Sequence, residues 1–222
     1  MTRKRRRATL QEPLGGAGLV EWFFPSFDEG KDRLDAWGDE SVRVVCDPPV
    51  YLLAATYGAG GGEVDASALE ALRPKGAAKL HWRDMTDRAR ARSIGAVAAL
   101  GASHTVVVGC DISRRGQERA RRKCLEAMLA SLESIGVTRY VLESRGSGRD
   151  AGDVGLLQSM RAKGMCRRID LAHEVGSSDS RLWVPDQVLG AYGDVRSGVA
   201  KRSLKEAWNA LAPSVEAIEI WP

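Results

Sequence analysis

The sequence is short of aromatic residues, histidine and cysteine, and each shortage argues against a class of protein. Aromatic residues make up 6% of the chain and are not interleaved with its basic runs. A stacking platform of the kind that binds single-stranded nucleic acid is therefore not predicted. The four cysteines are widely spaced, with no CxxC pair and no histidine at ligand spacing, which argues against a zinc site and a disulfide framework. We predict reduced, mostly buried thiols at Cys46, Cys110, Cys124 and Cys166.

Long apolar runs are also missing. The sequence has no extended uncharged apolar segment, and no leader in which charged residues precede an apolar run and a small-residue cleavage site. A membrane helix needs about 20 mostly apolar residues, and a secretory signal has the second pattern. We therefore predict no association with a membrane and a cytoplasmic location.

The sequence does contain enough hydrophobic residues for one sizeable core. It has 222 residues, of which 44% are hydrophobic, and a chain of this length forms one large domain or one domain with extensions. We predict a disordered basic tail over residues 1–18 and a single domain over residues 19–222. The sequence does not indicate an oligomeric state.

Positive charge is concentrated in three runs. The formal net charge is only +4, but arginine and lysine cluster within residues 3–7, 114–123 and 161–168. Such clusters are the electrostatic footprint of phosphate binding, although they are more often a solvated tail or a solvated helix face. Arg114 and Arg115, which begin the second run, are predicted contacts to nucleic acid.

Alternating strand and helix patterns predict an α/β domain. Strands are predicted over residues 33–39, 50–57, 105–110, 139–143 and 168–173. Helices are predicted over residues 65–72, 86–100, 117–135, 153–163 and 183–195. The first two strands would form a hairpin across residues 40–49, and the later helices would act as crossovers. The predicted fold is a mixed α/β sheet with an antiparallel second strand and helices on both faces.

Acidic residues stand at three places on this sheet where chemistry can use them. Asp39, with Glu40 beside it, is predicted at the end of the first strand, and Glu143 ends another. Asp186 lies on the helix over 183–195, roughly opposite its apolar stripe, so it faces something other than the core. Open α/β sheets bind their ligands at the carboxyl ends of strands. These acids are therefore candidate functional residues.

Each acid also has an ordinary explanation. Asp39 is a typical turn residue, Glu143 can pair with Arg145, and Asp186 can interact with a helix N-terminal dipole. Arg145 and Arg149 flank glycines just after Glu143. These two arginines are either phosphate contacts or part of a flexible solvated loop.

Four short motifs in order resemble a known family. They are Asp39-Glu-Ser, Lys79-Leu-His-Trp, Val141-Leu-Glu-Ser-Arg and Trp183-Val-Pro-Asp-Gln-Val-Leu-Gly-Ala. Together they resemble the domain-of-unknown-function family 3800 of the ribonuclease H-like superfamily, over about residues 34–195. The chain departs from the family pattern at Val42, where a glycine usually follows the first motif, and in an insertion at Cys46-Asp-Pro-Pro. The resemblance implies a ribonuclease H-like fold.

The resemblance also implies an activity and a set of site residues. Asp39, Glu143 and Asp186 would converge as metal ligands, with Glu40 as a possible fourth acid in the site. Such carboxylates suit Mg²⁺ or Mn²⁺, and two such ions would hydrolyse a phosphodiester in a nucleic acid. His81 would assist as a proton shuttle, because imidazole exchanges protons near neutral pH, or it is simply a packed residue.

Two other kinds of protein are compatible with parts of the sequence. One is a catalytically inactive module of the same fold that binds nucleic acid or a protein partner. The other is a nucleotide-binding protein with a doubly wound sheet, suggested by the glycines over residues 58–62. Glu63 stands where that motif needs its third glycine and no phosphate-loop lysine follows, which disfavours the second alternative. The sequence does not distinguish RNA from DNA.

Overall fold

A six-stranded mixed sheet forms the centre of the structure, a computed structural model that describes residues 33–113 and 116–222. The strands are β1 (Leu34–Arg43), β2 (Val50–Gly58), β3 (Ala102–Gly109), β4 (Val137–Glu143), β5 (Asp170–Glu174) and β6 (Val215–Ile220). Their order is β5-β4-β1-β2-β3-β6. β2 is antiparallel to β1 and β3, whereas β4 is parallel to β1, β5 to β4, and β6 to β3. The predicted mixed α/β sheet with an antiparallel second strand is confirmed. The predicted tail over residues 1–18, together with Arg114 and Arg115, lies outside the described residues.

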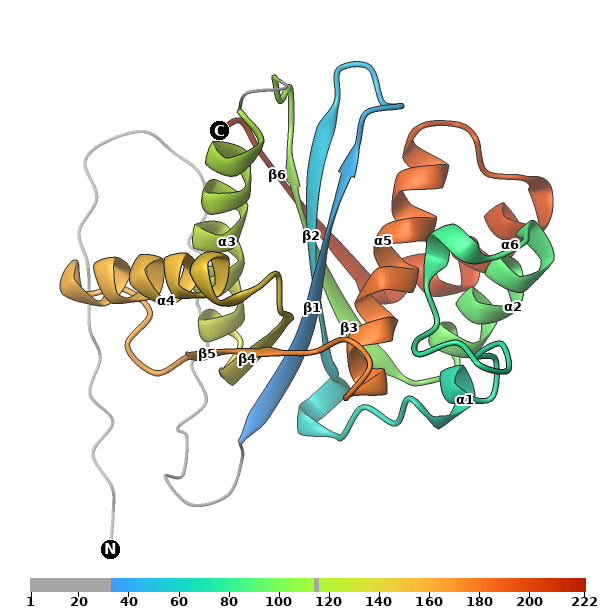
Figure 1. Cartoon of the computed structure of the whole chain (residues 1–222), viewed down its shortest axis with the longest axis horizontal. Coiled ribbons are helices and arrows are strands. Elements are labelled where there is room, and N and C mark those ends of the chain that lie inside the picture. The colour runs from blue at the N-terminus through green and yellow to red at the C-terminus, as the bar shows by residue number, and fades with distance from the viewer. Residues whose placement is uncertain (1–32, 114–115) are drawn as a thin grey trace, which may run out of the picture. The chain divides into compact units, whose positions relative to one another are not determined.

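Helices cover both faces of the sheet, as predicted (Figure 1). They are α1 (Ser67–Glu70), α2 (Asp87–Ala98), α3 (Gln117–Ser134), α4 (Ser147–Ala162), α5 (Trp183–Arg196) and α6 (Arg202–Leu211). In Figure 1, α3 and α4 lie on one side of the sheet, and α1, α2, α5 and α6 lie on the other. Within the described ranges, no helix combines the length and the apolar character that a membrane crossing requires.

Each face of the sheet has its own hydrophobic core, and β2 contributes to both. Successive residues of a strand point to opposite faces. Leu52 and Ala54 pack in the core on the α5 side, and Leu53 and Ala55 pack in the core under α3. Because helices cover both faces, the strand is apolar almost throughout rather than alternating. All four cysteines are buried in the fold.

β1 is longer than predicted, and this changes the setting of Asp39. The sequence prediction ended the strand at residue 39, but the structure pairs β1 with β2 as far as Arg43 opposite Val50. Asp39 and Glu40 therefore lie within a strand, and the turn interpretation was wrong. The predicted hairpin connection over 40–49 shrinks to residues 44–49. Pairing with β2 outweighs the poor strand propensity of residues 40–43.

β4 ends where the second half of β1 continues. Its last pairing with β1 joins Leu142 to Gly38, and beyond this point Glu143 pairs with Glu174 of β5. Residues 39–43 therefore extend past the carboxyl end of β4, and the sheet opens there. This is the kind of crevice in which open α/β sheets bind ligands.

Other elements also differ from the sequence prediction. α4 begins at Ser147 rather than at residue 153, so Arg149 lies on a helix and not in a loop. α6 and β6 follow the last predicted helix and add a strand beside β3. Ile135, the last residue of the predicted helix over 117–135, is 42% exposed because it caps the helix end.

Candidate active site

Asp39, Glu143 and Asp186 come from three elements and line one cavity. Residues two positions apart in a strand point to the same face of the sheet. Asp39 lies two residues after Trp37, and Glu143 lies two residues after Val141. Both apolar residues pack in the core on the α5 side. The two acids therefore point to the face that α5 covers, and Asp186 lies in the first turn of α5. The cavity that these acids line has a volume of about 440 Å³. The structure thus brings together the three acids that the sequence singled out.

Asp186 is held in place by a segment far away in the sequence. Its Oδ2 atom accepts hydrogen bonds from the backbone N of Trp82 at 2.8 Å and from Nε2 of Gln187 at 3.1 Å. The same oxygen lies 3.3 Å from Nδ1 of His81. His81 therefore lies in the candidate site, beside a carboxylate, as its predicted role requires.

Lys79 is a member of the site that the sequence reasoning missed. Its Nζ atom lies 2.6 Å from Oε1 and 2.9 Å from Oε2 of Glu143. The lysine stands in one of the quoted motifs, but no local pattern indicates a contact across 64 positions. Arg145, the alternative partner of Glu143, pairs with Glu40 instead, at 3.3 Å between Nε and Oε1.

The electrostatic environment of Asp39 is unfavourable to its ionised form. Burial, followed by repulsion from Asp186 and then from Glu143, raises the pKa of Asp39 well above its ordinary value. The backbone N–H of Glu40 donates to Oδ1 of Asp39 at 2.8 Å, and this bond and Lys79 lower the same pKa only in part. At Asp39, burial and repulsion therefore outweigh the stabilisation that Lys79 and the N–H of Glu40 give to the ionised carboxylate.

Glu40, the predicted fourth acid, belongs to an ion network on the α3–α4 side of the sheet. Arg121 of α3 lies 2.7 Å from Oε2 of Glu40 through Nε, and 2.6 Å from Oδ2 of Asp153 through Nη2. Asp153 also lies 3.0 Å from Nε2 of His173. Glu40 and Arg145 reach the rim of the carboxylate cavity where the sheet opens. The structure nevertheless gives Glu40 two arginine partners, whereas Asp39 faces the other acids.

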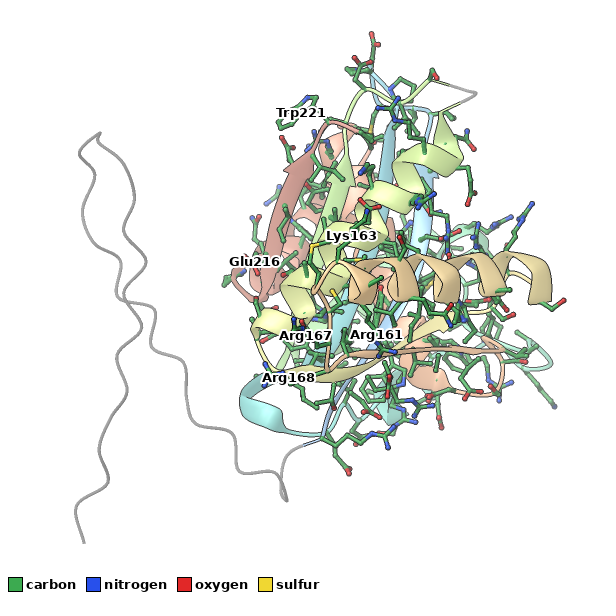
Figure 2. All side chains as sticks on the ribbon, turned by 90° about the vertical axis from the view of Figure 1, so that its left-hand side faces the viewer. Arg161, Lys163, Arg167, Arg168, Glu216 and Trp221 are labelled. Atoms are coloured by element: carbon green, nitrogen blue, oxygen red, sulfur yellow. The ribbon has the colours of Figure 1, made fainter. Side chains whose placement is uncertain are left out.

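The third basic run lies at the end of α4 and in the turn that follows it (Figure 2). Arg161 donates to the carbonyl oxygens of Cys166 and Ile169 and pairs with Asp170, so it closes the turn between α4 and β5. Figure 2 shows Lys163, Arg167 and Arg168 in the same turn. Arg149, a predicted nucleic-acid contact, is exposed in the first turn of α4. Of the two predicted basic contacts within the described residues, Arg145 lines the cavity and Arg149 does not.

The donor set fits a hard divalent cation. Asp39, Glu143 and Asp186 offer only carboxylate oxygens, which Mg²⁺ and Mn²⁺ prefer. As they stand, no three His, Cys, Asp or Glu side chains of residues 33–113 and 116–222 are close enough together to hold a metal ion. The Lys79 ammonium is the cation that pairs with the Glu143 carboxylate in this structure. A metal that used Glu143 would have to share it with Lys79.

Gly190 of α5 lets Trp82 approach the helix, and Trp82 positions Asp186. A methyl group at Gly190 would lie 2.1 Å from Cδ2 of Trp82, a side chain that is 3% exposed. We expect Gly190→Ala to lower stability by about 1–3 kcal/mol, because the buried ring has to move. Thermal unfolding measures this loss. Gly155→Ala on α4, where nothing lies within 4 Å of an added methyl group, is the matched control and should not lower the melting temperature. Equal melting temperatures for the two variants would contradict the packing argument.

Comparison with solved structures shows a distant likeness in fold. No protein-family model matches the sequence, and no curated protein matches it. Membership in the domain-of-unknown-function family 3800 therefore stays a prediction. Among solved structures, a chain from the PCNA:RNase HII complex of Archaeoglobus fulgidus is similar, with a TM-score of 0.47 and 11% sequence identity. The match covers 79% of this chain and 78% of that one.

Proposed function

We propose that this chain is a divalent-metal-dependent nuclease that hydrolyses phosphodiester bonds of nucleic acid. The convergence of Asp39, Glu143 and Asp186 in one cavity carries the proposal, since neighbouring carboxylates repel one another unless a cation lies among them. Mg²⁺ or Mn²⁺ held by these residues would activate a water molecule and stabilise the charge that develops on the phosphodiester. The resemblance to family 3800 is part of the same proposal.

Two neighbouring side chains have roles in this proposal. His81, 3.3 Å from Asp186, takes a proton from the site and passes it to solvent, as imidazole does near neutral pH. Arg145 lines the cavity, where its Nε pairs with Glu40 at 3.3 Å and its Nη2 with Asp153 at 3.9 Å. A guanidinium suits a backbone phosphate, which would compete with these two carboxylates for it.

Cleavage assays test this function. Labelled single-stranded and duplex RNA and DNA are incubated with Mg²⁺ or Mn²⁺ and with the parent protein, Glu143→Gln or Asp186→Asn. We expect the parent to cut at least one substrate and both variants to lose the activity. Glu216→Gln, which removes one exposed charge on β6 (Figure 2), is the control and should cut like the parent. Cleavage that survives in both acid variants would contradict the proposal.

A binding module without catalysis is the second candidate function. The ion pair between Lys79 and Glu143 favours it, because this pair already neutralises one of the three acids without a metal. Such a module would bind nucleic acid or a protein partner, and divalent ions would not raise its melting temperature. A nuclease of the proposed kind would be stabilised by Mn²⁺, since a ligand that binds only the folded state stabilises it.

A further inference from the structure

Acidic and basic side chains line the candidate cavity in equal number. The acids are Asp39, Glu40, Glu143 and Asp186, and the basic side chains, besides His81, are Arg43, Lys79, Arg83 and Arg145. A cation that pairs with an acid of the protein has to give up that partner before it can bind an anionic substrate. A basic side chain that is already in place and has no partner therefore binds a phosphate at the lowest cost.

Lys79 and Arg43 are both held by groups of the protein. The Lys79 ammonium lies 2.6 Å and 2.9 Å from the two carboxylate oxygens of Glu143. Nη1 of Arg43 donates to Oδ1 of Asp194 at 3.2 Å, and its Nη2 donates to two backbone carbonyl oxygens of α5 at 3.2 Å and 3.1 Å. These two cations hold Glu143 and α5 in place, and neither is free for a substrate.

Arg145 is held as well, on the other side of the sheet opening. Its Nε lies 3.3 Å from Oε1 of Glu40, and its Nη2 lies 3.9 Å from Oδ1 of Asp153. The Arg145 side chain is 16% exposed. A phosphate that approached this guanidinium would have to displace two carboxylates.

Arg83 differs from these three cations. It is exposed, and its guanidinium makes no hydrogen bond or ion pair with any other residue that the structure describes. Its backbone is nevertheless fixed, because it is the middle residue of a 3₁₀ turn over Trp82–Asp84. Trp82 is 3% exposed and donates its backbone N–H to Oδ2 of Asp186 at 2.8 Å. The turn therefore presents an unpaired guanidinium to the cavity from an ordered backbone.

The position of Arg83 favours a backbone phosphate as the anion that it binds. His81 and Trp82, the two residues before it, contact Asp186 at 3.3 Å and 2.8 Å. A phosphate bound to Arg83 would therefore lie close to the acids of the proposed cleavage site. A guanidinium offers two parallel N–H donors to a phosphate, and such contacts position a nucleic acid without reading its sequence.

We propose that Arg83 binds a backbone phosphate of the nucleic acid and holds the strand at the cavity, and that this contact forms without a metal ion. The inference rests on the proposed function for the identity of the ligand. It holds equally for a nuclease and for a module that binds nucleic acid without cutting it. Arg83, which the sequence did not single out, becomes a residue that contacts the substrate.

The salt dependence of binding tests this inference. Fluorescence anisotropy follows the binding of the full chain to labelled single-stranded and duplex RNA and DNA, in EDTA, so that binding is measured without cleavage. Each phosphate contact contributes about 0.9 to the slope of log affinity against log salt on a duplex, and about 0.7 on a single strand. Arg83→Gln should lose about that much slope, which makes binding about 5- to 8-fold weaker at about 0.1 M salt. Arg83→Lys keeps the charge and should keep the slope.

Arg88→Gln is the matched control. Arg88 is exposed on α2, close to Arg83 in the sequence, and does not line the cavity. Its substitution removes the same charge from the chain, so it reports the effect of net charge alone. This variant should keep the slope of the parent, and circular dichroism checks the folding of every variant.

The outcomes separate this inference from the proposed function. An unchanged slope in Arg83→Gln, or an equal loss in both glutamine variants, would overturn the contact and leave the metal-dependent function standing. A parent that binds none of the four nucleic acids in EDTA would overturn it too, while cleavage with Mg²⁺ or Mn²⁺ would still decide the function. Slope lost in Arg83→Gln alone supports the contact, even where the parent never cuts.

Discussion

Asp39→Asn is expected to abolish metal-dependent cleavage and, at the same time, to raise the melting temperature of the metal-free protein. The raised pKa of Asp39 shows that its negative charge is opposed by burial and by Asp186 and Glu143. Asparagine has nearly the same shape and no charge, so it removes this repulsion. In the proposed nuclease the substitution also removes a metal ligand, and we expect cleavage to fall by more than about 100-fold, beyond the loss typical of outer partners of a metal site.

The stability gain of Asp39→Asn should depend on pH with a definite sign. A carboxyl whose pKa is raised in the folded state stabilises the protein while it is protonated, below its unfolded pKa of about 3.9. That contribution is lost as the pH rises through the folded-state pKa. Asparagine does not ionise, so the melting temperature of the variant should exceed that of the parent by an amount that grows from acid to neutral pH.

Thermal unfolding at several pH values, with and without Mn²⁺, checks this prediction. Mn²⁺ should stabilise the parent much more than the variant, because only the parent keeps the full ligand set. Asp84→Asn, at an exposed acid close to His81 in the sequence, serves as the control and should follow the parent at every pH. A metal-free Asp39→Asn protein that melts below the parent at neutral pH would disprove the electrostatic account of the cavity.

Arg121→Met should destabilise the fold more than any other single substitution considered for this chain. Arg121 is 4% exposed and pairs with both Glu40 and Asp153, and Asp153 is 3% exposed. Removing one partner of a buried ion pair leaves an uncompensated charge, at a cost of about 3–5 kcal/mol. For a chain of this size, each 1 kcal/mol corresponds to about 2–4 °C in melting temperature. The expected fall is therefore more than about 6 °C.

The neighbouring arginine on the same helix provides the control. Arg122 is 62% exposed and lies 3.8 Å from Glu126 in an i,i+4 pair, and exposed pairs of this kind contribute about 0.3–0.5 kcal/mol. Arg122→Met should therefore melt close to the parent. Similar melting temperatures for the two methionine variants would show that the network around Arg121 does not hold the α3 face to the sheet.

Much of the fold follows from local patterns in the sequence. The sequence shows the apolar run of β2 and the apolar stripes of α3 and α5. From the stripe of α5, the sequence correctly predicted that Asp186 points away from the core. The end of β1 was not visible, because residues 40–43 form a strand only through pairing with β2. Strand propensity is weak in that segment, and pairing partners distant in sequence decided its structure.

The acidic residues of the site could be predicted from the sequence, but the basic residues that pair with them could not. Strand ends pointed to Glu143, and helix geometry pointed to Asp186. Lys79 and Arg121 gave no local signal, because each finds its acid partner in an element remote in the sequence. If the predicted first strand had continued to Arg43, the alternation of side chains along a strand would by itself have placed Asp39 and Glu40 on opposite faces of the sheet.

The adjacent residues Asp39 and Glu40 point to opposite faces of the sheet and have different surroundings there. Asp39 faces the candidate site, Glu40 accepts a hydrogen bond from Arg121 of α3 on the opposite face, and the backbone N–H of Glu40 donates to Oδ1 of Asp39. A mutational scan along β1 should therefore alternate in phenotype here: changes at Asp39 alter the response to metal, and changes at Glu40 lower the melting temperature. Inserting one residue before this pair would exchange the two sides and should cost both the fold and the activity, since a one-residue slip moves every side chain to the opposite face.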